Sequence, residues 1–97
     1  MATVESLAKL NAAAIRQIAA RHGASNVRVF GSVARAENAP SSDLDLLVDL
    51  DTGSSILDLV ALQQDLEDLL NQRVDVVTER SFSPYIRAAV LKDARPL

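Results

Sequence analysis

The chain has 97 residues, of which 48% are hydrophobic and 24% charged, with a net charge of -3 and no cysteine. This is the composition of an ordinary globular protein, and the length predicts a single domain over residues 1–97. Without cysteine, disulfides and thiolate metal sites are excluded, and the single histidine, His22, excludes a histidine-rich zinc site. Any bound metal must then be held by carboxylates, which favour Mg²⁺ or Mn²⁺.

The charge balance and hydropathy also limit the partners. An acidic chain without a basic stripe is poorly suited to bind a phosphate backbone, so we expect no direct nucleic-acid binding. No apolar run approaches the ~20 residues of a membrane span, and the N-terminus lacks the apolar core of a signal peptide. We therefore expect a cytoplasmic protein that does not bind a membrane.

The N-terminal segment has the spacing of a helix over residues 3–22. Thr3 is the expected N-cap and Gly23 the glycine that ends the helix, while Asn11 is where two shorter helices are the alternative. The apolar stripe of this segment is Leu7, Leu10, Ala14 and Ile18, with Ile15 beside it.

Three short strands are expected to follow, over residues 27–30, 43–50 and 74–78. The clearest is 43–50, where four aliphatic residues alternate with a face that holds Asp43, Asp45 and Asp49. Helices are expected over residues 56–70 and 84–92. The apolar stripe of the first of these is Leu59, Leu62, Leu66, Leu69 and Leu70.

The lengths of the connections predict the topology. The short link between the first two strands suits an antiparallel pair, and the helical link to the third suits a right-handed crossover between parallel strands. The chain therefore predicts an α+β fold, a small mixed sheet with helices mainly on one face.

Asp43 and Asp45 are the first candidates for chemistry. Because side chains alternate along a strand, both carboxylates lie on one face, ~7 Å apart along the strand. Two nearby carboxylates repel one another, and a divalent cation relieves that repulsion. The alternative is that this pair is a solvated outer face of an edge strand.

Two further features favour a site. Gly31 and Ser32 stand where the first strand ends, and a glycine before free N–H groups suits close approach of a phosphate. In an antiparallel pair this turn lies beside Asp43 and Asp45. Asp75 begins a strand parallel to theirs and faces the same side, so three carboxylates are expected at one end of the sheet, as in two-metal phosphoryl-transfer sites.

At this point the motifs match a known family. The string Phe30-Gly-Ser-Val-Ala-Arg35, then Ser42-Asp-Leu-Asp-Leu-Leu-Val48, with a later Asp75, resembles the minimal nucleotidyltransferase branch of the DNA polymerase beta-like nucleotidyltransferases. The resemblance covers nearly the whole chain. One departure is Ala36, where that branch usually has glycine.

The resemblance implies a nucleotidyltransferase that uses ATP and two Mg²⁺ ions, with Mn²⁺ possible in their place. It implies that Asp43 and Asp45 bridge both ions and that Asp75 completes the catalytic one, as a ligand and proton acceptor. Gly31 and Ser32 would bind the triphosphate through backbone N–H and hydroxyl groups. Arg35 and Ser42 would assist in nucleotide binding.

The resemblance also implies a partner, because the chain has no room for an acceptor-binding domain. Minimal nucleotidyltransferases are commonly paired with a HEPN-domain toxin, which the nucleotidyltransferase modifies as an antitoxin. We therefore expect AMP transfer to a hydroxyl, such as a tyrosine, of a partner in a hetero-oligomer. The alternatives are a small-molecule nucleotidyltransferase that needs a second subunit, and an antitoxin that acts by contact alone.

The remaining charged residues are interpreted as structural or solvated. Those of the second long helix, Glu67 among them, fit its polar face, and Asp49 fits a solvated edge. His22 suits a helix C-terminus, and Arg73 is indistinguishable from a surface residue.

Overall fold

The computed structural model describes residues 4–31 and 43–97, and its strands form a four-stranded mixed sheet. The strands are β1 (Ala24–Phe30), β2 (Leu44–Leu50), β3 (Val74–Val77) and β4 (Arg95–Pro96), in the spatial order β3-β2-β1-β4. β1 is antiparallel to both β2 and β4, and β2 is parallel to β3. The expected mixed sheet is confirmed, and β2, the strand that carries Asp45, is an interior strand.

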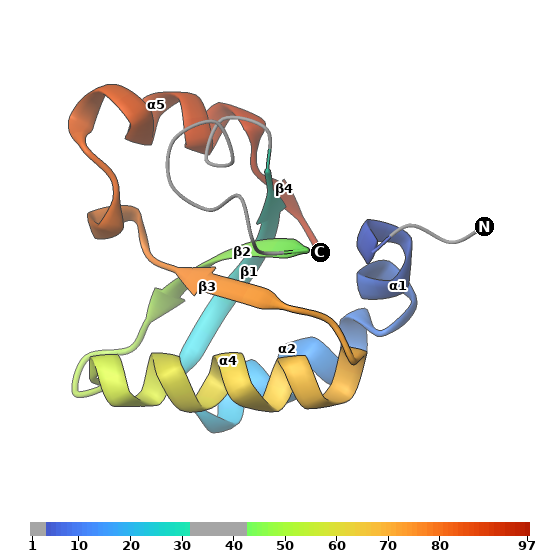
Figure 1. Cartoon of the computed structure of the whole chain (residues 1–97). Coiled ribbons are helices and arrows are strands. Elements are labelled where there is room, and N and C mark those ends of the chain that lie inside the picture. Colours follow the sequence, from blue (N-terminus) through green and yellow to red (C-terminus); the bar gives the residue numbers. More distant parts are fainter. Residues whose placement is uncertain (1–3, 32–42) are drawn as a thin grey trace.

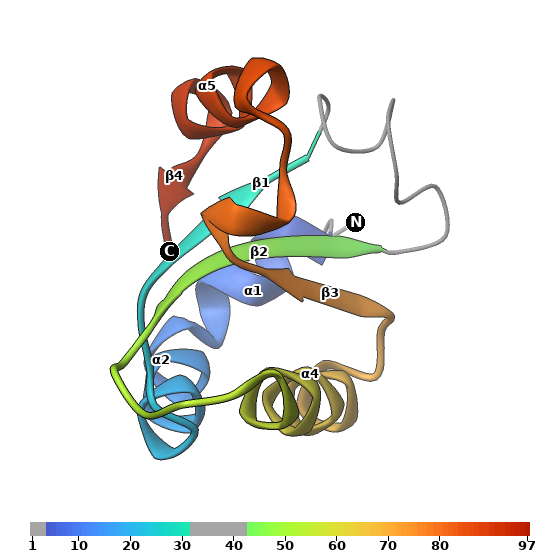
Figure 2. The same ribbon diagram turned by 90° about the vertical axis from the view of Figure 1, so that its left-hand side faces the viewer.

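Helices cover both faces of this sheet. They are α1 (Val4–Leu10), α2 (Ala12–Arg21), α4 (Ile56–Leu70) and α5 (Pro84–Asp93), with a short 3₁₀ turn, η1 (Glu79–Ser81), before α5. In Figures 1 and 2, α2 and α4 lie below the sheet and α5 lies above it. In the described part of the chain, no helix is both long and apolar enough to cross a bilayer.

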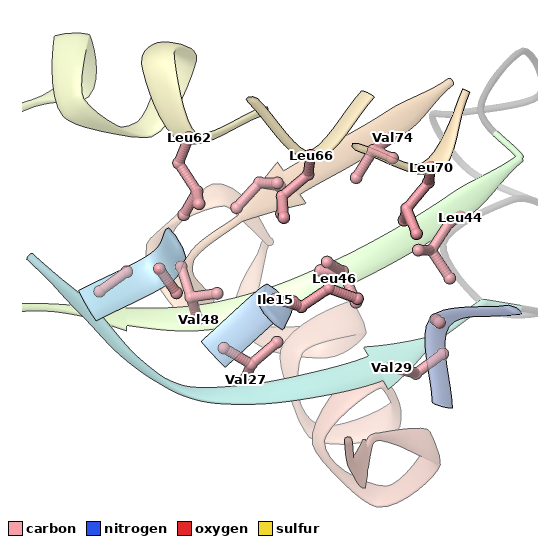
Figure 3. Packing of buried hydrophobic residues seen from close by; sticks show 14 of the residues in the cluster. Ile15, Val27, Val29, Leu44, Leu46, Val48, Leu62, Leu66, Leu70 and Val74 are labelled. Atoms are coloured by element: carbon pink, nitrogen blue, oxygen red, sulfur yellow. The ribbon is translucent and has the colours of Figure 1, made fainter. Parts of the chain in front are cut away.

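The main core lies between the sheet and the helices α2 and α4 (Figure 3). Leu44, Leu46 and Val48 alternate along β2 and all point into it, as the sequence pattern predicts. They meet side chains from both helices and from the neighbouring strands: Ile15, Ala19, Leu59, Leu62, Leu66, Leu70, Val27, Val29, Val74 and Val76. This layer contains most of the buried hydrophobic residues of the described part of the chain.

A smaller apolar cluster lies on the opposite face, under α5. It consists of Phe30 from β1, Leu47 from β2, and Phe82 and Val90 around α5. The rings of Phe30 and Phe82 meet edge to face, with centroids 5.6 Å apart. This cluster holds α5 over the end of β1, on the face to which alternation directs Asp45.

The N-terminal segment divides at Asn11, the alternative that the sequence left open. The Asn11 side-chain amide donates to the Leu7 carbonyl at 2.9 Å, so it satisfies one of the acceptors at the end of α1. α2 begins after this break, so α1 and α2 do not share one continuous apolar stripe. The stripe expected from the sequence is therefore wrong at Leu10, which is 81% exposed. Thr3, the expected N-cap, lies outside the described residues, whereas Gly23 has the positive φ of 73° expected of a C′ glycine.

The helix α4 has the bounds predicted from the sequence. Ser55 and Asp58 form a capping box at its start, and Asn71 adopts a left-handed conformation at its end. Its stripe is buried at Leu59, Leu62, Leu66 and Leu70, but Leu69 is 40% exposed, which corrects the expectation for that residue. Leu69 lies at the margin of the stripe, beside the buried Leu66 and Leu70.

β1 is longer than predicted and contains a β-bulge. The pairing with β2 shifts by one residue between Ser25 and Arg28, and Asn26 has a positive φ of 51°. The extra residue resets the alternation, so that Val27 and Val29 face the main core and Phe30 faces α5. The bulge thereby determines which face the end of β1 presents beside the aspartates.

Candidate active site

Asp45 and Asp75 lie side by side at the end of the sheet where β2 and β3 begin. In the parallel pairing of these strands Asp45 is the partner of Asp75, and on its other side Asp45 is the partner of Phe30, the last residue of β1. Neighbouring strands are about 4.8 Å apart, and residues in register project from the same face. The sheet therefore places two carboxylates next to one another, one residue from Gly31.

The apolar pattern of the strands decides which face the carboxylates occupy. Leu44 and Leu46 point into the core beneath the sheet, so Asp45 points to the other face, where Leu47 packs under α5. Val74 and Val76 direct Asp75 to that same face in the same way. The convergence of Asp45 and Asp75 thus follows from the burial of their neighbours.

The two carboxylates differ in burial. Asp45 is fully buried, at 0% exposure, and Asp75 is partly buried. The pKa of Asp75 is raised, first by burial and then by the negative charge of Asp45. Because Asp45 lies on an interior strand and is buried, the alternative of a solvated edge strand does not hold for it.

Asp43 is held differently. The Arg73 backbone N–H donates to its Oδ2 at 3.2 Å, and the Arg73 guanidinium Nε lies 3.8 Å from the same oxygen. The main chains of the two residues are also joined, since the Asp43 N–H donates to the Arg73 carbonyl at 2.9 Å. The Asp43 carboxylate therefore turns toward the start of β3, and Arg73, interpreted from the sequence as a surface residue, fixes it there.

These contacts determine which of the three predicted metal-binding carboxylates lie together. Within residues 4–31 and 43–97, no three His, Cys, Asp or Glu side chains lie close enough to hold one metal ion. The structure brings Asp45 and Asp75 together, and it places Asp43 two residues earlier with its carboxylate on Arg73. The pair fits a hard cation by its oxygen donor atoms, whereas the Asp43 carboxylate is turned to Arg73.

The predicted phosphate-binding residues are described only in part. Gly31 follows the last residue of β1 and is therefore adjacent to the start of β2, as expected from an antiparallel pair. Its backbone N–H donates to the Asp93 carboxylate of α5 at 3.0 Å. Ser32, Arg35 and Ser42 lie outside the described residues, so their roles remain predictions.

Two side chains of α4 support the strand that carries Asp75. β3 is an edge strand, and its outward N–H groups at Val74 and Val76 donate to Glu67 Oε2 at 3.0 Å and Gln63 Oε1 at 3.1 Å. From the sequence, Glu67 is expected on a solvated face and Gln63 is not distinguished from its neighbours. Their spacing of four residues beside the buried stripe is compatible with these contacts, but only the tertiary structure shows that they reach β3.

His22 and Asp49, which the sequence indicates to be structural or solvated, lie away from this site. His22 Nε2 is 2.6 Å from Asp65 Oδ2, which links the end of α2 to α4. Asp49 accepts from Arg28 at 2.8 Å and from Asn26 at 3.0 Å beside the β-bulge, four residues along β2 from Asp45. Both contacts are structural and neither contributes to the carboxylate pair.

Comparison with known proteins gives the family. Residues 13–97 match the model of the nucleotidyltransferase domain. The chain belongs to the nucleotidyltransferase-domain family. A solved structure of a candidate minimal nucleotidyltransferase is 48% identical to it and superposes with a TM-score of 0.78, over 99% of this chain and 97% of that one. The fold and sequence together place the chain in the minimal nucleotidyltransferase branch, as the sequence motifs indicated.

Two curated relatives of this nucleotidyltransferase carry more specific names. The protein adenylyltransferase MntA of Thermococcus cleftensis is 36% identical over 93 residues, which are 96% of this chain and 94% of the relative. A candidate protein adenylyltransferase of Methanocaldococcus jannaschii is 42% identical over 74 residues, 76% of this chain and 80% of that protein. The chain is thus an enzyme of the nucleotidyltransferase class, and enzymes of this kind generally use a nucleoside triphosphate with divalent metal ions.

Proposed function

We propose that this nucleotidyltransferase moves AMP from ATP to a hydroxyl group, such as a tyrosine, of a HEPN-domain toxin that it binds, and so acts as an antitoxin. The observation that carries the proposal is the pairing of Asp45 with Asp75 in register, with Asp45 opposite Phe30, the residue before Gly31. That arrangement supports the proposal, because it brings two carboxylates together near the expected triphosphate site at Gly31. The names of two relatives, both protein adenylyltransferases, favour AMP as the group and a protein as the acceptor.

The carboxylate set suits two Mg²⁺ ions, with Mn²⁺ as a substitute. Asp45 and Asp75 would hold them from neighbouring strands, and Asp43 would join after turning away from Arg73. When bound, the ions neutralise charge on the phosphates and lower the pKa of the acceptor hydroxyl. The chain supplies only oxygen ligands for this purpose, as these cations prefer.

The proposed reaction is an in-line displacement at phosphorus. The acceptor oxygen forms a bond to the α-phosphorus of ATP, the bond from that phosphorus to the bridging oxygen breaks, and pyrophosphate leaves. The acceptor proton passes to a carboxylate oxygen of Asp75, which lies beside Asp45 at this end of the sheet. Gly31 permits the triphosphate to approach the main chain at the end of β1.

Transfer of label from ATP tests this proposal directly. The purified chain is incubated with its genomic neighbour, Mg²⁺ and ATP labelled on either the α- or the γ-phosphate. We expect the α-label, and not the γ-label, to appear on the partner, together with the mass of AMP at a hydroxyl residue. Asp45→Asn should abolish the transfer, whereas Asp68→Asn on the exposed face of α4 should retain it.

Other outcomes identify the alternatives. Label on a small molecule, dependent on a second subunit, would indicate a small-molecule nucleotidyltransferase. Neutralisation of the partner without nucleotide, unaffected by Asp45→Asn, would indicate an antitoxin that acts by contact alone. Either result would overturn AMP transfer to a protein while leaving the family assignment in place.

A further inference from the structure

The carboxylate of Asp93 makes a contact that the reaction described above does not use. Asp93 is the last residue of α5 and is partly buried, and its Oδ2 accepts the backbone N–H of Gly31 at 3.0 Å. An anion at a helix C-terminus is unfavourable because of the helix dipole, so the position does not serve α5 itself. The contact with Gly31 gives a physical reason for an aspartate there.

The register of β4 explains how the two residues meet. β4 pairs with β1 through Arg28 with Pro96 and Val29 with Arg95, and two more steps along this antiparallel register place Gly31 opposite Asp93. The Leu97 N–H donates to the Val27 carbonyl at 3.1 Å, and bonded pairs alternate in such a ladder. Counted from the bonded pair Val27 and Leu97, the pair of Gly31 and Asp93 is therefore the second bonded position along the ladder.

At that position the main chain of Asp93 has already left the ladder. Asp93 is helical, and the next N–H, that of Ala94, donates to the Val90 carbonyl at 2.8 Å to close α5. The side chain of Asp93 consequently supplies the acceptor that a strand carbonyl would otherwise supply. This extends the pairing of β1 to Gly31, one residue past the position that faces Asp45.

We propose that Asp93 is a positioning residue for the nucleotide site. By accepting the Gly31 N–H, it holds Gly31 in place after the last residue of β1, next to Asp45. In this arrangement Gly31 contributes space for a phosphate and its N–H is committed to Asp93. The inference rests on the proposed function, because it requires Gly31 to begin the turn that binds ATP.

The test compares three variants by steady-state AMP transfer with ATP and Mg²⁺. Asp93→Ala removes the acceptor, and Asp93→Asn keeps an acceptor oxygen while it removes the charge. Asp58→Ala is the matched control, because Asp58 accepts the Ser55 N–H at 2.7 Å at the start of α4, after the far end of β2. Thermal unfolding of each variant reports the loss of stability separately from the kinetics.

We expect Asp93→Ala to raise the KM for ATP about tenfold with a smaller fall in kcat, as for loss of one hydrogen bond that holds the site. Asp93→Asn should restore most of the affinity. Asp58→Ala should lower the unfolding temperature comparably and leave the KM unchanged. Amide exchange at Gly31 should be faster in Asp93→Ala than in Asp93→Asn.

Four results would overturn the inference. A lower KM in both Asp93→Ala and Asp93→Asn would show that the carboxylate competes with the triphosphate. Equal kinetics for Asp93→Ala and Asp58→Ala would show that the bond only stabilises the fold. Failure of the wild-type chain to bind ATP would remove the proposed function and this inference together, whereas normal transfer with unaffected Asp93 variants would remove the inference alone.

Discussion

The attachment of β3 to α4 gives a prediction whose size follows from the structure. Gln63→Ala removes the acceptor for the Val76 N–H, a bond of 3.1 Å on the outer edge of β3. Val76 is only 4% exposed, so water replaces the lost acceptor poorly. A buried donor left unsatisfied costs about 1–3 kcal/mol, and the partial burial of this bond favours the lower half, about 1–2 kcal/mol.

In a domain of this size, each kcal/mol lowers the unfolding temperature by roughly 4–8 °C. We therefore expect Gln63→Ala to unfold roughly 4–16 °C below the wild type, measured by circular dichroism or calorimetry. Gln64→Ala is the matched control, because it changes the same residue type on the exposed face of the same helix. Amide exchange at Val76 should accelerate in Gln63→Ala alone. Equal unfolding temperatures for the two variants would refute the role given to the bond.

Three further predictions concern the site itself. Because burial and the Asp45 charge raise the pKa of Asp75, its protonated form contributes stability that is lost as pH rises above about 4. The metal-free wild type should therefore lose more stability from acidic to neutral pH than Asp75→Asn does, and parallel pH profiles would contradict this. Asp45→Asn should keep the fold, since the amide has the same shape and removes a buried charge, but it should weaken binding of ATP with Mg²⁺. Unchanged binding by calorimetry would exclude Asp45 as a metal ligand. Gly31→Val should reduce ATP affinity steeply by placing a branched side chain where phosphate approaches, and Ser32→Ala should reduce it less, by about 1–2 kcal/mol. Negligible effects of both variants would place the phosphates elsewhere.

Much of the fold was predictable because two segments have strong apolar patterns. The alternation that ends at Leu50 predicted β2 within one residue, and the stripe between Ile56 and Leu70 predicted α4 with the observed bounds. The parallel pairing that brings Asp45 beside Asp75 followed from the length of the crossover between them. These features depend on local periodicity and chain length, which a single sequence contains.

Other features depend on contacts that leave no local signal. β4 has only two residues, Arg95 and Pro96, too few for any periodicity. The bond from Gly31 to Asp93 spans 62 residues and arises from the register of β4 with β1. The start of β1 was missed because the bulge at Asn26 interrupts the alternation that identifies a strand.

The pairing of Asp45 with Asp75 was predictable from the sequence, but the side-chain arrangement around it was not. The spacing of Asp43 and Asp45 predicts both carboxylates on one face of a strand, whereas Asp43 precedes β2 and its carboxylate turns to Arg73. The contact of Asp43 with Arg73 depends on how the chain enters β3, and the burial of Asp45 depends on the packing around it. A carboxylate pair can therefore be found by spacing, whereas its burial and partners require the fold.

Turnover of the partner protein tests the central claim most directly, because only an enzyme modifies more than its own amount. The chain is mixed with a large excess of its genomic partner, ATP and Mg²⁺, and the fraction of partner that carries AMP is followed by mass spectrometry. We expect each molecule of the chain to modify many partner molecules. The double variant Asp45→Asn, Asp75→Asn should bind the partner but modify none. Partner that stays unmodified and is neutralised only at one-to-one ratios, equally by wild type and by this variant, would contradict it.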